Sequence, residues 1–273
     1  MILGFFMGII IMSAIGCLLG FGLAWLARVM AVETDPKTEQ ILAILPGANC
    51  GACGYPGCAG YADAIVKDGV ETNLCSAANQ DMITKIGNIV GRTADAKKRY
   101  VAKIKCMGVR DPNKLQYAFN GEDDCFAVYS MYQGNKECKY GCVGYGNCAK
   151  ICPTGAIKRD ELNRLYVDSN ICIGCKKCMT VCPARVIEMV PIDGGYYIAC
   201  NSHDNAKVVR EICGKGCLGC KACERLSGDA NRICVDNFLS KINYESETDL
   251  SLAATKCPGH VIIPIITPIK KEL

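Results

Sequence analysis

The chain has 273 residues, a formal net charge of +4, 22 cysteines and only two histidines, His203 and His260. This length favours two or three small units over one large core. The mild charge and the 7% aromatic content do not favour a nucleic-acid partner. The shortage of histidine argues against His-rich zinc, haem or di-iron sites. The cysteines have cluster spacings rather than a disulfide framework, so they should face a reducing compartment.

The N-terminal stretch from Ile2 to Trp25 is continuously apolar and predicts one membrane-spanning helix. A cleavable signal peptide is the alternative, but the chain lacks a basic segment before the apolar run. Arg28 and Lys37 follow the span and no basic residue precedes it. The positive-inside rule therefore predicts a single-pass protein of the cell membrane, with its N-terminus outside and its cysteine-rich part in the cytoplasm.

Glycine pairs recur within this apolar stretch. Gly4 and Gly8 form one G-x₃-G pair, and Gly16 and Gly20 form another. Such pairs allow close helix–helix approach in the lipid bilayer and favour packing on other membrane subunits. The alternative is that glycine is simply common in membrane helices.

A compact one-cluster domain is predicted next. A short amphipathic helix over residues 34–45 has Thr34 or Asp35 as its N-cap. Further helices are expected over residues 58–67 and 81–90. Between them lies a C-x₂-C-x₄-C-x₁₆-C spacing whose glycines let the backbone approach a cluster and donate N–H groups to its sulfurs. Zinc is the alternative for the four thiolates, Cys50, Cys53, Cys58 and Cys75.

Residues 91–105 are rich in lysine and arginine. Two interpretations stay open at this point. The basic side chains either form a solvated linker face, or they are attracted to anionic lipid close to the membrane.

Residues 172–183 carry a C-x₂-C-x₂-C-x₃-C-P run, which is the ligand pattern of a bacterial [4Fe–4S] site. A tight loop aims three thiolates at one cluster, and the fourth cysteine, Cys182, starts the next helical turn and ligates the other cluster of a two-cluster fold. A zinc ribbon is the alternative, but zinc knuckles have no reason to add a third C-x₂-C step.

A second, stretched half-motif covers residues 138–153, and the segments 156–168 and 186–190 are expected to form short strands. Together they predict a two-cluster ferredoxin-like unit with crossed ligation. One cluster is assigned to Cys138, Cys142, Cys148 and Cys182, and the other to Cys152, Cys172, Cys175 and Cys178.

The last segment repeats the preceding one at an offset of 75 residues. The offset relates Cys125 to Cys200, Cys138 to Cys213 and Tyr145 to Cys220. The second copy keeps one cluster site and lacks the cysteines of the other. Its predicted ligands are Cys217, Cys220, Cys223 and Cys257.

Four [4Fe–4S] clusters thus account for 16 of the 22 cysteines. The remainder are Cys17, Cys106, Cys125, Cys200, Cys213 and Cys234. Free or buried thiols are the default interpretation of these positions. A fifth cluster held by Cys106, Cys125, Cys200 and Cys213 is the open alternative.

The predicted fold class is α+β, with one transmembrane helix, a small [4Fe–4S] domain and two ferredoxin-like repeats. The expected segments are the anchor (1–28), the four-cysteine domain (33–91), a linker (92–124), the two-cluster domain (125–195) and a degenerate one-cluster repeat (196–273).

This order of parts resembles the long form of the B subunits of Rnf complexes. The stretches that carry the resemblance most specifically are residues 45–58, LPGANCGACGYPGC, and residues 139–148, KYGCVGYGNC. The four-cysteine spacing of residues 50–75 is also similar to a domain of corrinoid iron–sulfur proteins, but those have no membrane helix. The chain departs from the family in its last segment, where the second cluster site of the C-terminal copy is missing.

The resemblance implies a subunit of a membrane complex that oxidises reduced ferredoxin, reduces NAD⁺ and moves Na⁺ or H⁺. Its implied partners are other membrane and cytoplasmic subunits, soluble ferredoxin and the lipid bilayer. No G-x-G-x-x-G follows an expected strand, so nicotinamide and flavin sites should lie on partners. No residue is expected to act as acid, base or nucleophile, because the clusters carry the chemistry.

A docking face for acidic ferredoxin is one interpretation of the basic residues of the middle unit, and ordinary surface charge is the other. These residues are Lys139, Lys150, Lys158, Lys176, Lys177 and Arg185. Two different functions compete with the Rnf interpretation: a membrane-anchored zinc scaffold without a redox role, and a ferredoxin-like subunit of another membrane dehydrogenase or hydrogenase.

Overall fold

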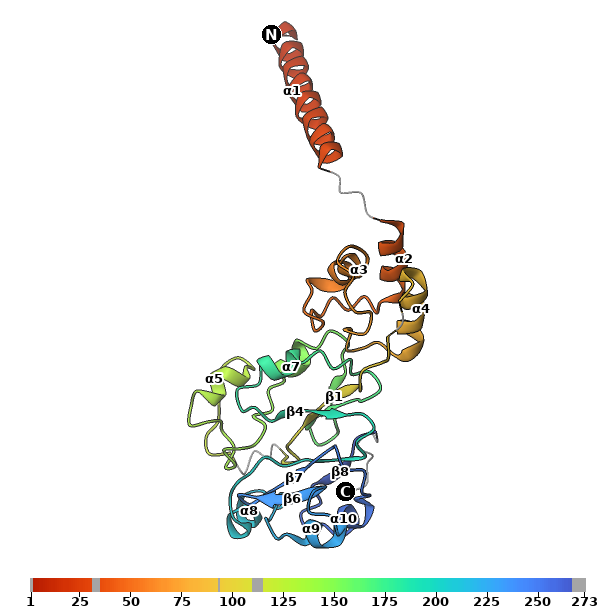
Figure 1. Ribbon diagram of the computed structural model, residues 1–273. Helices are drawn as coiled ribbons and strands as arrows, with labels where there is room; N and C mark the ends of the chain where they lie inside the picture. Colours follow the sequence, from red (N-terminus) through yellow and green to blue (C-terminus); the bar gives the residue numbers. More distant parts are fainter. Residues whose placement is uncertain (1, 31–34, 93, 110–114, 267–273) are drawn as a thin grey trace.

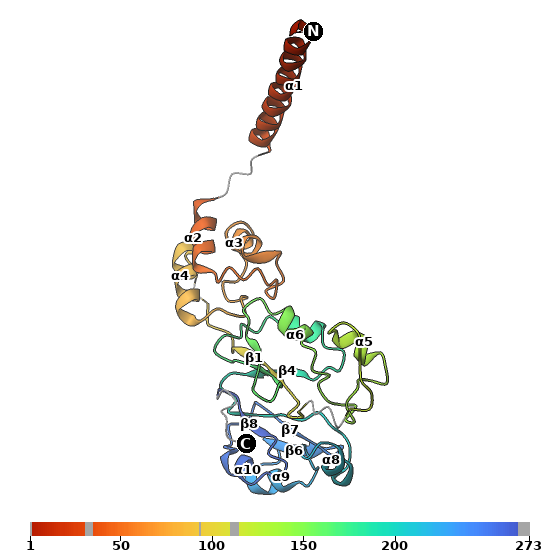
Figure 2. The same cartoon turned by 180° about the vertical axis from the view of Figure 1, so that it is seen from behind.

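The structure is a computed structural model that describes residues 2–30, 35–92, 94–109 and 115–266. It is a mixed α and β protein that begins with the long helix α1 (Ile2–Val29). Figures 1 and 2 show α1 at one end, followed by three units arranged along the long axis of the molecule. The predicted fold class, with one N-terminal apolar helix and iron–sulfur-type units, is confirmed.

Helix α1 is long and apolar enough to cross a membrane. Its stretch Phe6–Val29 covers 24 residues, has a mean hydropathy of 2.3 and is 0% buried within the described part of the chain. Because such exposed side chains as Leu18 and Phe21 are costly in water, their natural surroundings are lipid or other apolar helices.

The first unit is a three-helix domain of α2 (Pro36–Ile44), α3 (Gly57–Lys67) and α4 (Gln80–Val90). Asp35 caps α2 by accepting a hydrogen bond from Lys37 N, as predicted, whereas Thr34 lies outside the described residues. The core between the helices contains the fully buried Ile41, Tyr61, Ile65 and Ile86. These apolar residues recur at helical spacing, which is why the three helices pack on one another.

The middle unit contains two small antiparallel sheets. Strand β1 (Tyr100–Ile104) pairs with β4 (Ile187–Pro191), and β2 (Ile157–Arg159) pairs with β3 (Leu165–Val167). The short helices α5 (Cys125–Tyr129), α6 (Asn147–Lys150) and α7 (Lys177–Thr180) complete it. The predicted strands around residues 156–168 and 186–190 are therefore present.

The segment predicted as a linker, 92–124, contributes strand β1 to this unit. Val101, Ala102 and Ile104 are buried in its core, and the side chain of Lys103 is only 4% exposed. Lys103 Nζ donates to the Val167 carbonyl and lies over the Tyr197 ring. Part of the basic stretch is thus integrated into the fold and is not available as a solvated or lipid-facing surface.

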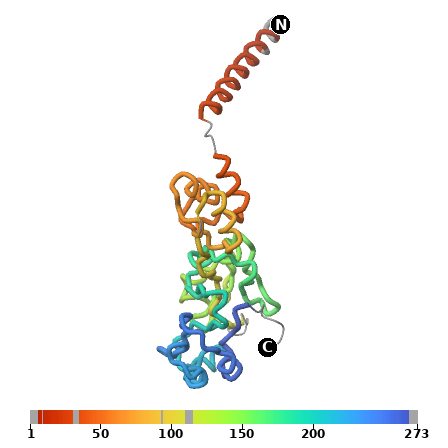
Figure 3. The backbone as a smooth tube through the Cα atoms, turned by 45° about the vertical axis from the view of Figure 1, so that its right-hand side comes forward, coloured from red at the N-terminus to blue at the C-terminus, as the bar shows by residue number. Residues whose placement is uncertain are grey.

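The C-terminal unit repeats the architecture of the middle one. Strand β5 (Tyr196–Ile198) pairs with β8 (Ile262–Pro264), and β6 (Ile233–Asp236) pairs with β7 (Leu239–Ile242). Helices α8 (Ala206–Ile212), α9 (Ala222–Ser227) and α10 (Ser251–Thr255) lie around these strands. In Figure 3 this blue unit continues the column of the other two.

The structural equivalence of the two repeats differs from the 75-residue offset at one place. Strands β5 and β1 open the two units, and each is followed after one intervening residue by a cysteine, Cys200 and Cys106. Cys125 instead opens helix α5. The structural counterpart of Cys200 is therefore Cys106, because both leave a strand that pairs with the last strand of its own unit.

Candidate iron–sulfur sites

The cysteines of the described chain gather into five groups of four. Group 1 contains Cys50, Cys53, Cys58 and Cys75. Group 2 contains Cys152, Cys172, Cys175 and Cys178. Group 3 contains Cys125, Cys142, Cys148 and Cys182. Group 4 contains Cys106, Cys138, Cys200 and Cys213. Group 5 contains Cys217, Cys220, Cys223 and Cys257.

Group 1 lies at the N-terminal end of helix α3. Asn49 Oδ1 accepts a hydrogen bond of 2.8 Å from Cys58 N and so ties the first loop to the helix. Tyr61 Oη accepts from Leu74 N and donates to the Glu71 carbonyl, which fixes the segment that carries Cys75. Burial, with neighbouring Cys50 and Cys53, raises the pKa of the Cys75 thiol.

Group 2 combines the compact cysteine run with Cys152 from the other half-motif, as crossed ligation predicts. Burial raises the pKa of Cys178 to about 12, and the neighbouring thiols of Cys172, Cys148, Cys175 and Cys152 contribute to the rise. Two polar groups already approach these sulfurs. Ala102 N donates to Cys172 Sγ at 3.4 Å, and Thr154 Oγ1 lies 3.7 Å from Cys152 Sγ.

Group 3 lines a cavity of about 340 Å³ in the middle unit, and its membership differs from the predicted set. The structure brings Cys142, Cys148 and Cys182 together as expected, but the fourth cysteine is Cys125 rather than Cys138. Burial raises the pKa of Cys148 to about 12, and the thiols that add to this effect are those of Cys125 and Cys182.

The sequence contains a signal for this exchange. Position 145, which corresponds to Cys220 in the last repeat, is a tyrosine, so the middle repeat lacks the second cysteine of its run. Cys125 on α5 takes that place, and Asn147 holds it there. Asn147 Oδ1 accepts from Cys125 N at 3.1 Å, and Asn147 Nδ2 donates to Asp124 Oδ2 at 2.7 Å.

Group 5 lines a second cavity of about 340 Å³, with the predicted membership. Strand β7 supplies two polar contacts to it. Ser240 N donates to Cys217 Sγ at 3.3 Å, and Ser240 Oγ lies 3.4 Å from Cys223 Sγ. Group 5 therefore has sulfur-directed donors of the same kind as group 2.

The donor chemistry of these groups fits an iron–sulfur cluster better than a single metal ion. Tetrahedral zinc with Zn–S bonds of about 2.3 Å requires sulfurs roughly 3.8 Å apart. No group of three or more His, Cys, Asp or Glu side chains in the described residues converges closely enough to hold one ion. Four thiols around a wider cavity, approached by N–H and O–H donors, match a cubane cluster.

Two further cysteines of the described chain belong to no group. Cys17 lies on the exposed surface of α1, and Cys234 is exposed on strand β6. Among the described residues there is thus a clear separation between grouped and ungrouped thiols.

Two family models match the chain. The model described as "Putative Fe-S cluster" matches residues 45–77, which contain group 1. The model described as "4Fe-4S dicluster domain" matches residues 140–186, which contain all of group 2 and most of group 3.

Relatives that match over most of their length carry consistent names. The chain is 30% identical over 254 residues to the B subunit of an ion-translocating oxidoreductase complex of Methanosarcina acetivorans, covering 93% of this chain and 96% of the relative. It is 33% identical to the B subunit of the Na⁺-translocating ferredoxin:NAD⁺ oxidoreductase complex of Acetobacterium woodii, covering 92% and 75%. It is also 33% identical to the B subunit of the proton-translocating ferredoxin:NAD⁺ oxidoreductase complex of Clostridium ljungdahlii, covering 95% and 92%. The chain therefore belongs to the family of B subunits of ion-translocating oxidoreductase (Rnf) complexes, as its motifs predicted.

Proposed function

We propose that this protein is the iron–sulfur electron-transfer subunit of an Rnf complex. In this role it accepts electrons from reduced ferredoxin and passes them towards NAD⁺ reduction, which the complex couples to Na⁺ or H⁺ translocation. The single observation that carries the proposal is the set of cysteine groups that follow one another along one elongated chain. The names and the coverage of the relatives support the same role.

The bound [4Fe–4S] clusters supply one-electron transfer. The chain's own residues hold them in order. Cys175 of group 2 lies close to Cys50 of group 1, and Cys178 of group 2 lies close to Cys148 of group 3. Groups 1, 2 and 3 are thus adjacent, from the unit that follows the membrane helix down into the middle unit (Figure 1).

The proposed ligands of these clusters are groups 1, 2, 3 and 5. This proposal keeps 15 of the 16 cysteines predicted from the sequence and replaces Cys138 with Cys125 in group 3. The N–H and O–H donors that approach the sulfurs of groups 2 and 5 favour an iron–sulfur cluster over zinc at these groups. The positions of the clusters relative to the membrane follow from α1, whose flanking Arg28 favours the cytoplasmic side for the cysteine-rich units.

The soluble electron donor is proposed to dock on the middle unit, near groups 2 and 3. Lys176 is exposed beside Cys175 of group 2, and Arg185 is exposed three residues after Cys182 of group 3. Lys158 instead pairs with Asp168 at 3.9 Å, and Lys150 donates to the Asp123 carbonyl. Part of the predicted positive charge is therefore engaged within the chain. Ferredoxins are commonly acidic, so Lys176 and Arg185 would steer the encounter.

The test of the proposed function is reduction of the purified, oxygen-free protein by reduced ferredoxin at increasing ionic strength. We expect visible cluster absorbance to bleach, with a rate that falls steeply as salt rises and that falls further in Lys176→Glu/Arg185→Glu. Lys207→Glu/Arg210→Glu, at two exposed positions on helix α8 of the last unit, is the matched charge control. No bleaching by ferredoxin would reject the proposed function, and salt-independent bleaching would reject the docking site alone.

A further inference from the structure

Groups 1, 2 and 3 are adjacent to one another, but group 5 lies in the C-terminal unit and is separated from them. Between groups 3 and 5, at the junction of the two ferredoxin-like units, lies a third cysteine-lined cavity. It is lined by the four cysteines of group 4.

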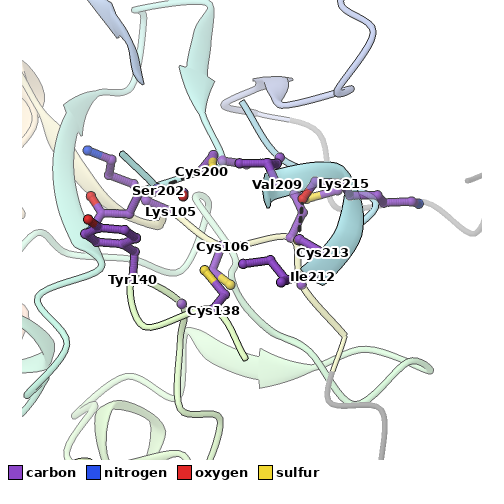
Figure 4. Close-up of a pocket in the computed structure, with 16 residues that line it drawn as sticks. Lys105, Cys106, Cys138, Tyr140, Cys200, Ser202, Val209, Ile212, Cys213 and Lys215 are labelled. Carbon is purple, nitrogen blue, oxygen red and sulfur yellow. Dashed lines mark hydrogen bonds between the residues drawn. The ribbon is translucent and has the colours of Figure 1, made fainter. Parts of the chain in front are cut away.

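We infer that Cys106, Cys138, Cys200 and Cys213 bind a fifth [4Fe–4S] cluster, shared between the middle and the C-terminal units. Figure 4 shows Cys106 and Cys138 side by side in this cavity, with Cys200 and Cys213 across from them. This inference rests on the proposed electron-transfer function and extends it. The sequence offered a fifth cluster only as an alternative, and with Cys125 in place of Cys138.

The ligands are two pairs of structurally equivalent residues. Cys106 and Cys200 each follow the opening strand of a unit, after β1 and β5. Cys138 stands four residues before Cys142 of group 3, and Cys213 stands four residues before Cys217 of group 5. Each unit therefore presents the same two thiols at the junction, and neither unit alone can complete a four-thiolate site.

Three glycines bring the backbone close to sulfurs of group 4, where an added Cβ would make ordinary van der Waals contact with them. A Cβ on Gly108 would lie 3.6 Å from Cys106 Sγ and 3.7 Å from Cys213 Sγ. A Cβ on Gly141 would lie 3.7 Å from Cys106 Sγ, and one on Gly216 would lie 3.7 Å from Cys200 Sγ. Glycines against the sulfurs let the backbone approach a bulky group closely.

Backbone donors are also present. Ser202 N donates to Cys200 Sγ at 3.5 Å, which is the same kind of N–H···S contact that groups 2 and 5 receive. Cys213 Sγ donates to the Lys215 carbonyl at 2.6 Å, and this thiol gives up that proton when it binds iron as a thiolate.

Group 4 joins the groups on either side of it. The Cys106 thiol lies close to Cys142 of group 3, and the Cys200 thiol lies close to Cys217 of group 5. A cluster at this site would make the five groups one continuous series from the first unit to the last. Without it, the C-terminal cluster has no neighbour in the described chain.

The test is iron and acid-labile sulfide per chain in the full-length protein, purified in detergent without oxygen. Five [4Fe–4S] clusters require about 20 of each, and four require about 16. We expect about 20 in the wild type and about 16 in Cys200→Ser/Cys213→Ser. The second pair, Cys106→Ser/Cys138→Ser, should give the same loss, and Cys17→Ser/Cys234→Ser should give none.

Electron paramagnetic resonance of the dithionite-reduced protein identifies which cluster is lost. The two group 4 variants should lack the same signal and the same magnetic coupling between neighbouring clusters, while the signals of groups 1, 2, 3 and 5 remain. A wild-type value of about 16, or about 16 irons with one zinc per chain, would overturn the fifth cluster and leave the proposed function intact. Little iron in any form of the protein would reject the proposed function itself.

Discussion

At the residue scale, the proposed replacement of Cys138 by Cys125 in group 3 moves one ligand along the sequence while the site stays in place. In the last unit all three cysteines of the run are local, at 217, 220 and 223. In the middle unit the second position is Tyr145, whose ring packs edge-on against Phe119 and whose hydroxyl accepts from Asn135. A buried tyrosine thus occupies the place of a thiol, and α5 supplies the ligand from outside the run.

The first prediction concerns this exchange. Cys125→Ser should remove about four irons per chain by opening group 3. Adding Tyr145→Cys should restore them, because position 145 matches a ligand position of the last unit. Iron analysis and resonance spectra of the single and double variants check this. Cys125→Ser with unchanged iron would contradict the assignment of Cys125.

The second prediction concerns the hydroxyl of Ser240. Hydrogen bonds to cluster sulfurs stabilise the reduced, more negative state and so raise the reduction potential. Ser240→Ala removes the contact to Cys223 Sγ and keeps the backbone donor to Cys217 Sγ. We expect the potential of the group 5 cluster to fall by about 20 to 40 mV, which corresponds to about 0.5 to 1 kcal/mol.

Ser227→Ala is the control for the second prediction. Its hydroxyl lies on α9 of the same unit but donates to the Glu224 carbonyl. Redox titration followed by resonance spectroscopy separates the group 5 signal from the others. Equal shifts in the two variants would show that the effect is not local to the sulfur.

At the element scale, strand β1 is the part of the fold that the sequence did not predict. Its residues, Tyr-Val-Ala-Lys-Ile, lie in a stretch whose lysines and arginines suggested a solvated linker. Strand β1 forms only when β4, 83 or more residues later in the chain, pairs with it from Tyr100↔Pro191 to Ile104↔Ile187. A local pattern cannot reveal such a long-range pairing, whereas the capped helices α2 and α4 depend on nearby residues and were predictable.

The cluster sites also differ in whether nearby or distant residues in the sequence determine their ligands. Groups 1 and 5, and the three local cysteines of group 2, follow from spacing because a loop and one turn of helix place their thiols. Groups 3 and 4 draw cysteines from separate elements, so their membership depends on how α5 and the two opening strands pack. That is why the sequence alone assigned Cys138 to the set that we propose Cys125 completes, and left the junction site as an alternative.

The third prediction tests the contact between β1 and the cluster loop. Gly174 has φ +68°, and a Cβ there would lie 2.5 Å from the Tyr100 carbonyl oxygen. Gly155 has φ +63° and nothing within 4 Å. Alanine at either position costs about 1 kcal/mol through its left-handed backbone, but only at Gly174 must strand β1 also move.

We therefore expect Gly174→Ala to lose the group 2 cluster much faster than Gly155→Ala. The measurement is the decay of visible absorbance on mild heating with an iron chelator present. Matching decay rates in the two variants would mean that β1 does not support the loop.

At the scale of the whole molecule, the chain connects a membrane helix to a column of redox-active units. Its membership of the Rnf B-subunit family implies other subunits around it. Helix α1 is the part of the described chain with the largest exposed apolar surface, and Gly16 and Gly20 lie on one face of it. A Cβ added at either glycine would have nothing within 4 Å. Such a face fits close packing against a neighbouring membrane helix.

The fourth prediction follows from that face. Gly16→Ile/Gly20→Ile should weaken association with the membrane subunits, because two branched side chains prevent close helix approach. Gly22→Ile lies on the opposite side of the helix and serves as the control. The measurement is the yield of partner subunits that co-purify with the tagged protein, and equal losses in both variants would argue against this contact surface.

We propose that this single chain carries a continuous series of iron–sulfur clusters that reduced ferredoxin reduces. The most direct measurement is rapid mixing of the oxygen-free full-length protein with excess reduced ferredoxin, counting the electrons taken up per chain from the loss of visible absorbance. A connected series predicts uptake into groups 1 to 5 with nearly the same time course, for clusters whose potentials lie above that of the donor. If the group 5 cluster of Cys200→Ser/Cys213→Ser were reduced as fast as that of the wild type, electrons would not pass through the junction site. If the wild-type protein took up no electrons from ferredoxin, the electron-relay function itself would be contradicted.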